Sequence, residues 1–257
     1  EFFVDGTPEI GDVYDGSTWR TILVGGLNKG GKGYYALDIT DPLAPKALWQ
    51  YCDDATLCSQ TDAKMGYSYG NPVITKLGGD WVVMFTSGYN NTDGKGYLYA
   101  VNAFTGANKF APIATSCTGT NCGISKIAPW IESYEDNTTT RVYGGDLDGN
   151  LWRFDVNNIL APAGRDAFKL ATVGNPPTLI QSITTKPGLA RVENDAVVFV
   201  GTGRFLGVSD KSDSSVNSFY AIKDNLLATG LGPVRTNGAL VSQTLSFSTS
   251  KNGQNVT

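Results

Sequence analysis

Four stretches of the chain share one pattern, and this internal repeat limits the folds that are open to it. Each is an apolar run that ends in small residues: TILVGGL (21–27), VVMFTSG (82–88), RVYGGDL (141–147) and VVFVGTG (197–203). The terminal glycines of these runs are 62, 57 and 58 residues apart, and they are Gly26, Gly88, Gly145 and Gly203. A period of this size indicates a repeated supersecondary unit.

Each apolar run is followed, after a loop of variable length, by an aromatic run. These runs are YYALD (34–38), YLYAVN (97–102), LWRFD (151–155) and FYAIK (219–223), and equivalent places in them are taken by Tyr35, Tyr99, Trp152 and Tyr220. Further strands are predicted at EIGDVY (9–14), KALWQY (46–51), NPVITKL (71–77), FKLATV (168–173) and PGLARV (187–192). Three or four strands per repeat is typical of a propeller blade.

The composition favours the same fold. The chain has 31 glycines and 11% aromatic residues but only 17% charged residues, as many short strands joined by tight turns require. A single twisted sheet cannot bury both of its faces, whereas blades stacked around an axis cover one another. We predict an all-β protein, a modified or incomplete β-propeller with four visible blades and one domain over residues 1–257. A β-solenoid or a pair of sandwiches is the alternative.

Four cysteines form two close pairs, Cys52 with Cys58 and Cys117 with Cys122. Each pair is surrounded by small polar residues, which favours short disulfides that close loops in an oxidising compartment. A zinc site is the competing interpretation, but the two-residue spacing of zinc ligands and histidine are both absent from the sequence.

Three longer segments of the sequence resemble a known family. They are FFVDGTPEIGDVY, GGKGYYALDITDP and GDLDGNLWRFD, and their order and spacing are similar to the C-terminal propeller of the PilY/PilC family of type IV pilus tip adhesins. The resemblance covers nearly the whole chain. It implies a fragment of a larger secreted protein whose N-terminal region is absent from this sequence.

The resemblance also implies a function. Members of this family are exported through the periplasm to the cell surface, where they associate with minor pilins at the pilus tip. They promote pilus biogenesis, twitching motility and attachment to host or abiotic surfaces, and several are regulated by calcium. We expect the same role here, through protein–protein and surface binding; which surface binds is not readable from the sequence.

The family's calcium loop lies just before GDLDGN, with oxygen ligands at alternate positions. Counted back from Tyr143, the equivalent positions here are Glu132, Tyr134, Asp136, Thr138 and Thr140. Only Glu132 and Asp136 carry a carboxylate, which is too little negative charge for tight calcium binding. We therefore expect a degenerate calcium loop and interpret ESYEDNTTTR as a solvated hairpin loop, with no confident cofactor.

The alternating Asp146, Asp148 and Asn150 of GGDLDGN suggest a second metal site. However, the segment joins two apolar strands, where Asp-Gly favours a hairpin turn because glycine accepts a positive φ. We interpret these residues as a turn, and likewise TDGKG (92–96) and KNGQN (251–255).

The five tryptophans are candidates for a carbohydrate-binding or partner-binding surface, but most lie within strand patterns, which favours packing between blades. They are Trp19, Trp49, Trp81, Trp130 and Trp152. The long insertions at 52–66, 113–127 and 207–217 are candidate binding loops, because loops tolerate change around a rigid scaffold. A formal charge of −4 argues against nucleic acid as a partner, and no apolar run is long enough for a transmembrane segment.

The alternative function is a quinoprotein (PQQ) dehydrogenase, because GYLYAVNAFTGA (96–107) is similar to the structural repeat of that propeller superfamily. The repeat says nothing about a bound quinone. The sequence has no histidine, so it has neither a Ser-His-Asp nor a Cys-His pair. Paired carboxylates suited to glycoside hydrolysis remain open, but no pair is singled out. We expect a protein that is not an enzyme.

Overall fold

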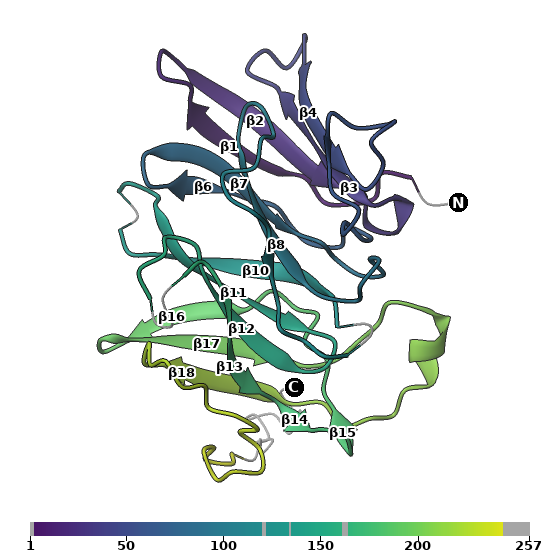
Figure 1. The fold of residues 1–257 in the computed structure, drawn as a ribbon, viewed down its shortest axis with the longest axis vertical. Coiled ribbons are helices and arrows are strands. Elements are labelled where there is room, and N and C mark those ends of the chain that lie inside the picture. The colour runs from purple at the N-terminus through teal and green to yellow at the C-terminus, as the bar shows by residue number, and fades with distance from the viewer. Residues whose placement is uncertain (1–2, 120–121, 134, 161–163, 244–257) are drawn as a thin grey trace, which may run out of the picture.

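The computed structural model describes residues 3–119, 122–133, 135–160 and 164–243 (Figure 1). Over these residues the chain forms strands joined by loops, with two short 3-10 helices, η1 (Asn28–Gly30) and η2 (Val208–Ser212). The expectation of an all-β protein is confirmed. Among the described residues, no helix has the length and apolar character needed to span a membrane.

The strands form four main antiparallel sheets that follow one another along the chain. The first sheet contains β1 (Glu9–Tyr14), β2 (Trp19–Gly26), β3 (Gly33–Asp38) and β4 (Lys46–Cys52), with the short β5 (Gln60–Thr61) parallel to β4. The second contains β6 (Val73–Leu77), β7 (Asp80–Thr86), β8 (Tyr97–Asn102) and β9 (Ile113–Ala114).

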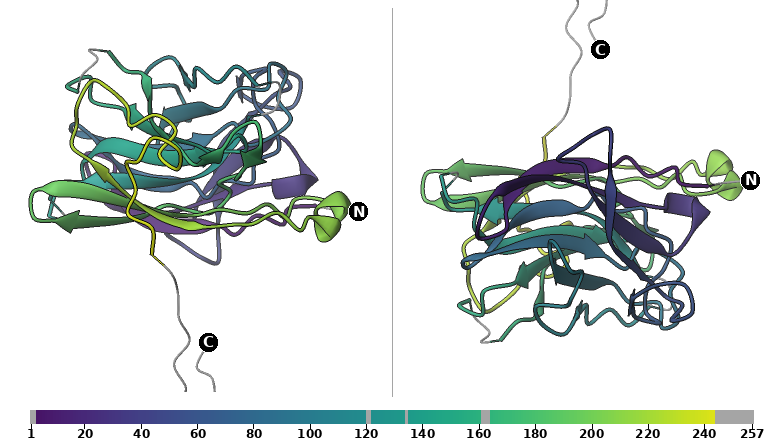
Figure 2. Two further views of the ribbon diagram at one scale, coloured as in Figure 1. Left: turned by 90° about the horizontal axis from the view of Figure 1, so that it is seen from below. Right: turned by 90° about the horizontal axis from the view of Figure 1, so that it is seen from above.

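The third sheet contains β10 (Ile124–Ile131), β11 (Thr139–Asp146), β12 (Asn150–Asp155) and β13 (Ala167–Thr172). A two-stranded sheet follows, with β14 (Gly174–Asn175) and β15 (Leu179–Ile180). The fourth main sheet contains β16 (Gly188–Val192), β17 (Asp195–Gly201) and β18 (Phe219–Asp224). The first strands of successive sheets touch, since β1 contacts β6, β6 contacts β10 and β10 contacts β16. Figure 1 shows the four sheets stacked in chain order, and Figure 2 shows the stack from its two ends.

Three apolar cores fill the spaces between successive sheets. Side chains alternate along a strand, so one strand supplies two cores: Val83 and Phe85 of β7 face the first sheet, while Val82 and Met84 face the third. Between the third and fourth sheets the core includes a buried ion pair, in which Arg153 Nη1 lies 2.8 Å from Asp224 Oδ1. Each inner sheet is thus covered on both faces, as in a stack of propeller blades.

The strand predicted as aromatic is the third strand of every sheet, and its equivalent positions are confirmed by the register. Tyr35, Tyr99, Trp152 and Tyr220 each pair with a residue near the end of the second strand, namely Gly25, Phe85, Gly144 and Val200. Three of these aromatic rings enter the successive cores and are buried. The fourth, Tyr35, is half-buried on the outer face of the first sheet.

The predicted repeat was wrong about where two of its strands end. Gly26 and Gly145 lie within strands, but Gly88 and Gly203 lie two residues beyond β7 and β17. Their φ values of 66° and 140° are incompatible with a continuing strand and require glycine.

The strand β10 was also missed, because Pro129 interrupts its apolar pattern. Proline is tolerated there because β10 is the edge strand of its sheet, with β11 as its neighbour on one side. The predicted insertion at 113–127 therefore includes β9 and the start of β10. The insertion at 52–66 similarly includes the last residue of β4 and all of β5, and that at 207–217 includes η2.

Candidate functional site

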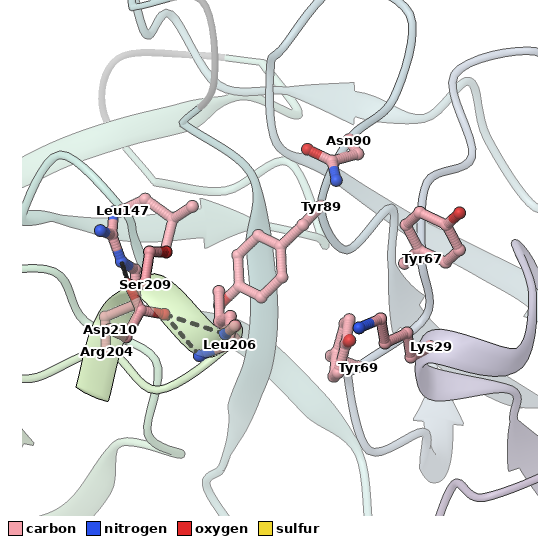
Figure 3. A pocket seen from close by; sticks show the side chains of 11 residues that line it. Lys29, Tyr67, Tyr69, Tyr89, Asn90, Leu147, Arg204, Leu206, Ser209 and Asp210 are labelled. Carbon is pink, nitrogen blue, oxygen red and sulfur yellow. Dashed lines mark hydrogen bonds and ion pairs between the residues drawn. The ribbon is translucent and has the colours of Figure 1, made fainter. Parts of the chain in front are cut away.

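One cavity lies where loops from all four sheets converge, and its volume is about 340 Å³ (Figure 3). The connections between second and third strands supply Lys29 from the first sheet, Tyr89 and Asn90 from the second, Leu147 from the third, and the segment 204–210 from the fourth. The connection from β5 to β6 adds Tyr67 and Tyr69. None of the lining residues belongs to a strand of the main sheets.

The tyrosines are fixed by a close crossing of two loop segments. The backbone amide of Tyr67 donates to the carbonyl of Tyr89 at 2.7 Å, and the amide of Tyr89 donates to the carbonyl of Tyr67 at 3.2 Å. A Cβ atom on Gly88 would lie 1.7 Å from the Tyr67 carbonyl oxygen, so the crossing requires glycine there. The small residues that end the apolar runs therefore permit the loops to approach one another.

Tyr89 forms the centre of the cavity lining. Its ring is buried, and its hydroxyl lies 2.8 Å from the Ser125 hydroxyl on β10. Burial raises the pKa of Tyr89 to about 12, so the hydroxyl stays neutral at ordinary pH. Tyr69 is half-buried, with its ring centroid 5.8 Å from that of Tyr89.

On one side of Tyr89, Arg204 is held in place by Asp210 (Figure 3). Arg204 Nε donates to Asp210 Oδ1 at 3.0 Å, while Asp210 Oδ2 accepts the backbone amides of Leu206 and Gly207 at 2.7 and 3.0 Å. The backbone hydrogen bonds, followed by the guanidinium, lower the pKa of Asp210. The second cation, Lys29, lies on the other side of Tyr89, next to Tyr69.

The groups that line this cavity are able to bind a ligand. The lining offers two cations, aromatic faces, and the neutral polar groups of Asn90 and Ser209. Its carboxylate, that of Asp210, is occupied by three donors, and the sequence contains no histidine that would activate Ser209 as a nucleophile. The sequence analysis placed Ser209 and Asp210 within the candidate binding loop 207–217, but it did not single out the lining residues that come from the other loops. Their signal was position, since most of them follow a strand that ends in small residues.

The segment GGDLDGN forms the predicted hairpin turn between β11 and β12, and Gly149 has a φ of 78°. Asp146 is buried, and its Oδ1 accepts the amides of Asp148 and Asn150 at 3.0 and 2.8 Å. Its Oδ2 accepts Asn150 Nδ2 at 2.9 Å and Trp152 Nε1 at 2.8 Å. Four donors thus satisfy the carboxylate, and its role is to hold the turn.

One of the other two predicted turns is confirmed. In TDGKG, Asp93 Oδ1 accepts the amide of Lys95 at 3.2 Å and Gly94 has a φ of 71°, as a turn requires. KNGQN lies outside the described residues.

Both predicted disulfides are present, Cys52 with Cys58 and Cys117 with Cys122. The sulfur atoms of Cys117 and Cys122 also lie near a carboxylate oxygen of Asp146. Because the two sulfurs are bonded to each other, neither is a free thiolate, and the zinc alternative is wrong for both pairs.

The loop predicted as a degenerate calcium site joins β10 to β11, and arginines occupy its first carboxylate. Glu132 Oε1 accepts Arg141 Nη2 at 2.9 Å, and Oε2 accepts Arg191 Nη2 of β16 at 2.5 Å. Burial opposes ionisation of Glu132, but these partners outweigh it and the pKa of Glu132 is lowered. Asp136 Oδ1 accepts the amide of Thr138 at 2.8 Å. Tyr134 lies outside the described residues. The expected loss of calcium binding stays a prediction.

The tryptophans mainly pack between sheets, as expected. Trp49, Trp130 and Trp152 are buried, and Trp81 is partly buried against the first core. Trp19 is the exception, with 59% of its surface exposed and its ring 6.1 Å from that of Trp81.

Comparisons with known proteins give one consistent match. Residues 1–253 match the family model described as the PilY1 beta-propeller domain. The chain is 33% identical over 275 residues to the type IV pilus biogenesis factor PilY1 of Pseudomonas aeruginosa, which covers 95% of this chain and 23% of the relative. A PilY1 homolog of Xylella fastidiosa is 34% identical over 230 residues, covering 87% of this chain and 18% of the relative.

A solved structure agrees with this match. The crystal structure of the Pseudomonas aeruginosa PilY1 C-terminal domain is similar with a TM-score of 0.78 and 29% identity, covering 91% of this chain and 52% of that chain. The expected propeller fold is confirmed. The chain spans less than a quarter of the length of the curated relatives it matches.

Proposed function

This chain belongs to the family of PilY1 β-propeller domains, and we propose that it serves type IV pilus biogenesis as a binding module. The observation that carries the proposal is the family match over residues 1–253, together with relatives named as pilus biogenesis factors. The proposal includes the finer functions expected from the sequence: twitching motility, adhesion to host or abiotic surfaces, and association with minor pilins at the pilus tip. It also includes export through the periplasm to the cell surface.

The mechanism we propose is docking through the loops that surround the cavity. Four sheets bring these loops to one place, and buried contacts such as the Tyr67–Tyr89 crossing hold them there. A surface that is fixed before its partner arrives loses little conformational entropy on binding. The cavity has no pair of residues suited to nucleophilic catalysis, which supports a role that is not enzymatic.

A single added methyl group tests this mechanism. Gly88→Ala places a Cβ against the Tyr67 carbonyl, whereas Gly79→Ala makes the same chemical change at a position with nothing within 4 Å. Each variant gene is introduced into a strain that lacks the wild-type gene, and protein levels are compared by immunoblot. We expect Gly88→Ala to reduce surface pili and twitching, and Gly79→Ala to match wild type.

Two outcomes would count against the proposal. If the strain without the gene keeps normal pili, the role in pilus biogenesis is wrong. If Gly88→Ala is present at wild-type level and supports normal pili and normal capture of minor pilins from solution, docking through these loops is wrong.

For the enzymatic alternative, purified protein is mixed with pyrroloquinoline quinone, calcium and a primary alcohol. Quinone-dependent oxidation of the alcohol would replace the binding role.

A further inference from the structure

The loop cavity contains polar side chains whose hydrogen-bonding groups have no partner within the described part of the chain. Tyr67, Tyr69, Asn90 and Ser209 line it, and within the described part of the chain none of their side chains donates or accepts a hydrogen bond. All four are at least partly exposed. Hydroxyl and amide groups of this kind donate and accept hydrogen bonds with equal ease, as recognition of ligand hydroxyl groups requires.

Arg204 adds a fixed positive charge. Its Nε is bound by Asp210, which is anchored in turn by two backbone amides, so the guanidinium has a set orientation. Among the described residues, no hydrogen bond involves the two terminal nitrogens of Arg204, and 44% of its side chain is exposed. These nitrogens are donors of the geometry that suits a carboxylate.

The shape of the lining narrows the ligand class. Tyr89 and Tyr69 present ring surface between Arg204 and Lys29, and aromatic faces pack well against the apolar face of a sugar ring (Figure 3). The volume of about 340 Å³ suits a small ligand unit rather than a folded surface. A peptide captured by strand addition would need an open strand edge, and loops alone line this cavity.

We propose that this cavity binds an acidic saccharide, with the sugar carboxylate on Arg204, the ring against Tyr69 and Tyr89, and the sugar hydroxyls on Asn90 and Ser209. The inference rests on the proposed adhesion role and gives it a ligand class. A uronic acid unit within a surface polysaccharide has all three of these chemical features.

The test compares D-glucuronate with D-glucose, which lacks the carboxylate, by ligand-observed NMR titration of the purified protein. We expect glucuronate to bind at least about tenfold more tightly than glucose. Arg204→Gln is expected to reduce glucuronate affinity to the level of glucose, and Tyr69→Ala to weaken both sugars. Lys211→Gln is the matched control, because this neighbouring cation of η2 does not line the cavity, and it should bind like wild type.

Circular dichroism confirms that each variant is folded. The proposal is overturned if wild-type protein binds neither sugar, if it binds both equally, or if folded Arg204→Gln binds glucuronate like wild type. It is also overturned if a peptide with a free C-terminal carboxylate displaces glucuronate and has the lower dissociation constant of the two, since the cavity would then serve a protein partner.

Cells separate this inference from the proposed function. With attachment counted per surface pilus, bacteria carrying Arg204→Gln should attach less than wild type to a surface coated with polyglucuronate, and as well as wild type to a surface coated with an uncharged glucan. If they attach to polyglucuronate like wild type, the saccharide role is wrong while the role in pilus biogenesis stands.

Discussion

Asp146 shows how one buried carboxylate fixes a turn. Its carboxylate accepts hydrogen bonds from two backbone amides and also from Asn150 Nδ2 and Trp152 Nε1. Replacing one carboxylate oxygen by an amide NH₂ would place a donor where these donors need an acceptor. We predict that Asp146→Asn lowers the free energy of unfolding by about 1–3 kcal/mol, measured by urea denaturation at pH 7. The matched control is Asp148→Asn, which alters a partly exposed carboxylate two residues away and should change stability by less than about 0.5 kcal/mol. Equal losses would show that the four hydrogen bonds do not stabilise the turn.

The same carboxylate gives a pH dependence. Burial raises the pKa of Asp146 to about 6 from an ordinary value of 3.8, although the hydrogen bonds from Asn150 and Trp152 favour the charged form. Between these values the folded state binds more protons than the unfolded state, so the contribution of Asp146 falls as pH rises. We predict that the stability of wild type relative to Asp146→Asn is greatest below about pH 4 and declines until about pH 6. A difference that rises over this interval would contradict the raised pKa.

Some residue roles were readable from the sequence and others were not. The turn at Gly149 was predictable because Asp-Gly favours a positive φ between two apolar runs. The bond from Trp152 to Asp146 was not, because it depends on which face of β12 the ring occupies. The Arg204–Asp210 pair lies in an irregular loop, where sequence spacing gives no distances. For that reason the cavity was found only in the structure.

At the scale of elements, the β10–β11 connection is joined to the next sheet by Glu132. Arg191 of β16 and Arg141 of β11 bind its two oxygens, and the guanidinium groups lie 5.2 and 5.0 Å from the Trp130 ring. The positive charge that pairs with the Glu132 carboxylate thus comes from Arg141 and Arg191. A cation would have to displace these bonds before it could bind Glu132.

We predict that calcium titration calorimetry finds no stoichiometric micromolar site in this loop. Glu132 is engaged by arginines, and Asp136 alone supplies too little negative charge for such affinity. The Asp136→Ala variant serves as the comparison, and its heats should match those of wild type. A micromolar site that disappears in Asp136→Ala would show that the loop still binds calcium.

Elements with a regular apolar pattern were predictable almost to the residue. The predicted strand at 9–14 coincides with β1, and that at 97–102 coincides with β8. Prediction failed where another requirement replaced the pattern: Pro129 is allowed by the free edge of β10, and β9 is only two residues long. The two-stranded β14–β15 sheet was also missed, since strands this short carry no periodicity.

At the scale of the whole molecule, one face of each sheet packs against the sheet that precedes it along the chain. Tyr99, Trp152 and Tyr220 all point from the third strand of their sheet into the core shared with the preceding sheet. Tyr35 takes the equivalent place in the first sheet, where it lines a mainly apolar cavity of about 730 Å³ with Leu37 and Leu57. No described segment covers this face as a sheet. We therefore predict that in the whole protein a further blade packs on it, as both faces of a propeller blade require.

Two equivalent substitutions test this prediction in two proteins. In the 257-residue chain, Tyr99→Ala should cost about 3–5 kcal/mol because it leaves a cavity in a closed core. Tyr35→Ala should cost less than about 1 kcal/mol there, since its ring is only half-buried. In the whole protein the covering blade should raise the cost of Tyr35→Ala toward that of Tyr99→Ala, as measured by denaturant unfolding. If Tyr35→Ala costs the same small amount in both proteins, nothing packs on this face, and the repeat ends at the first sheet.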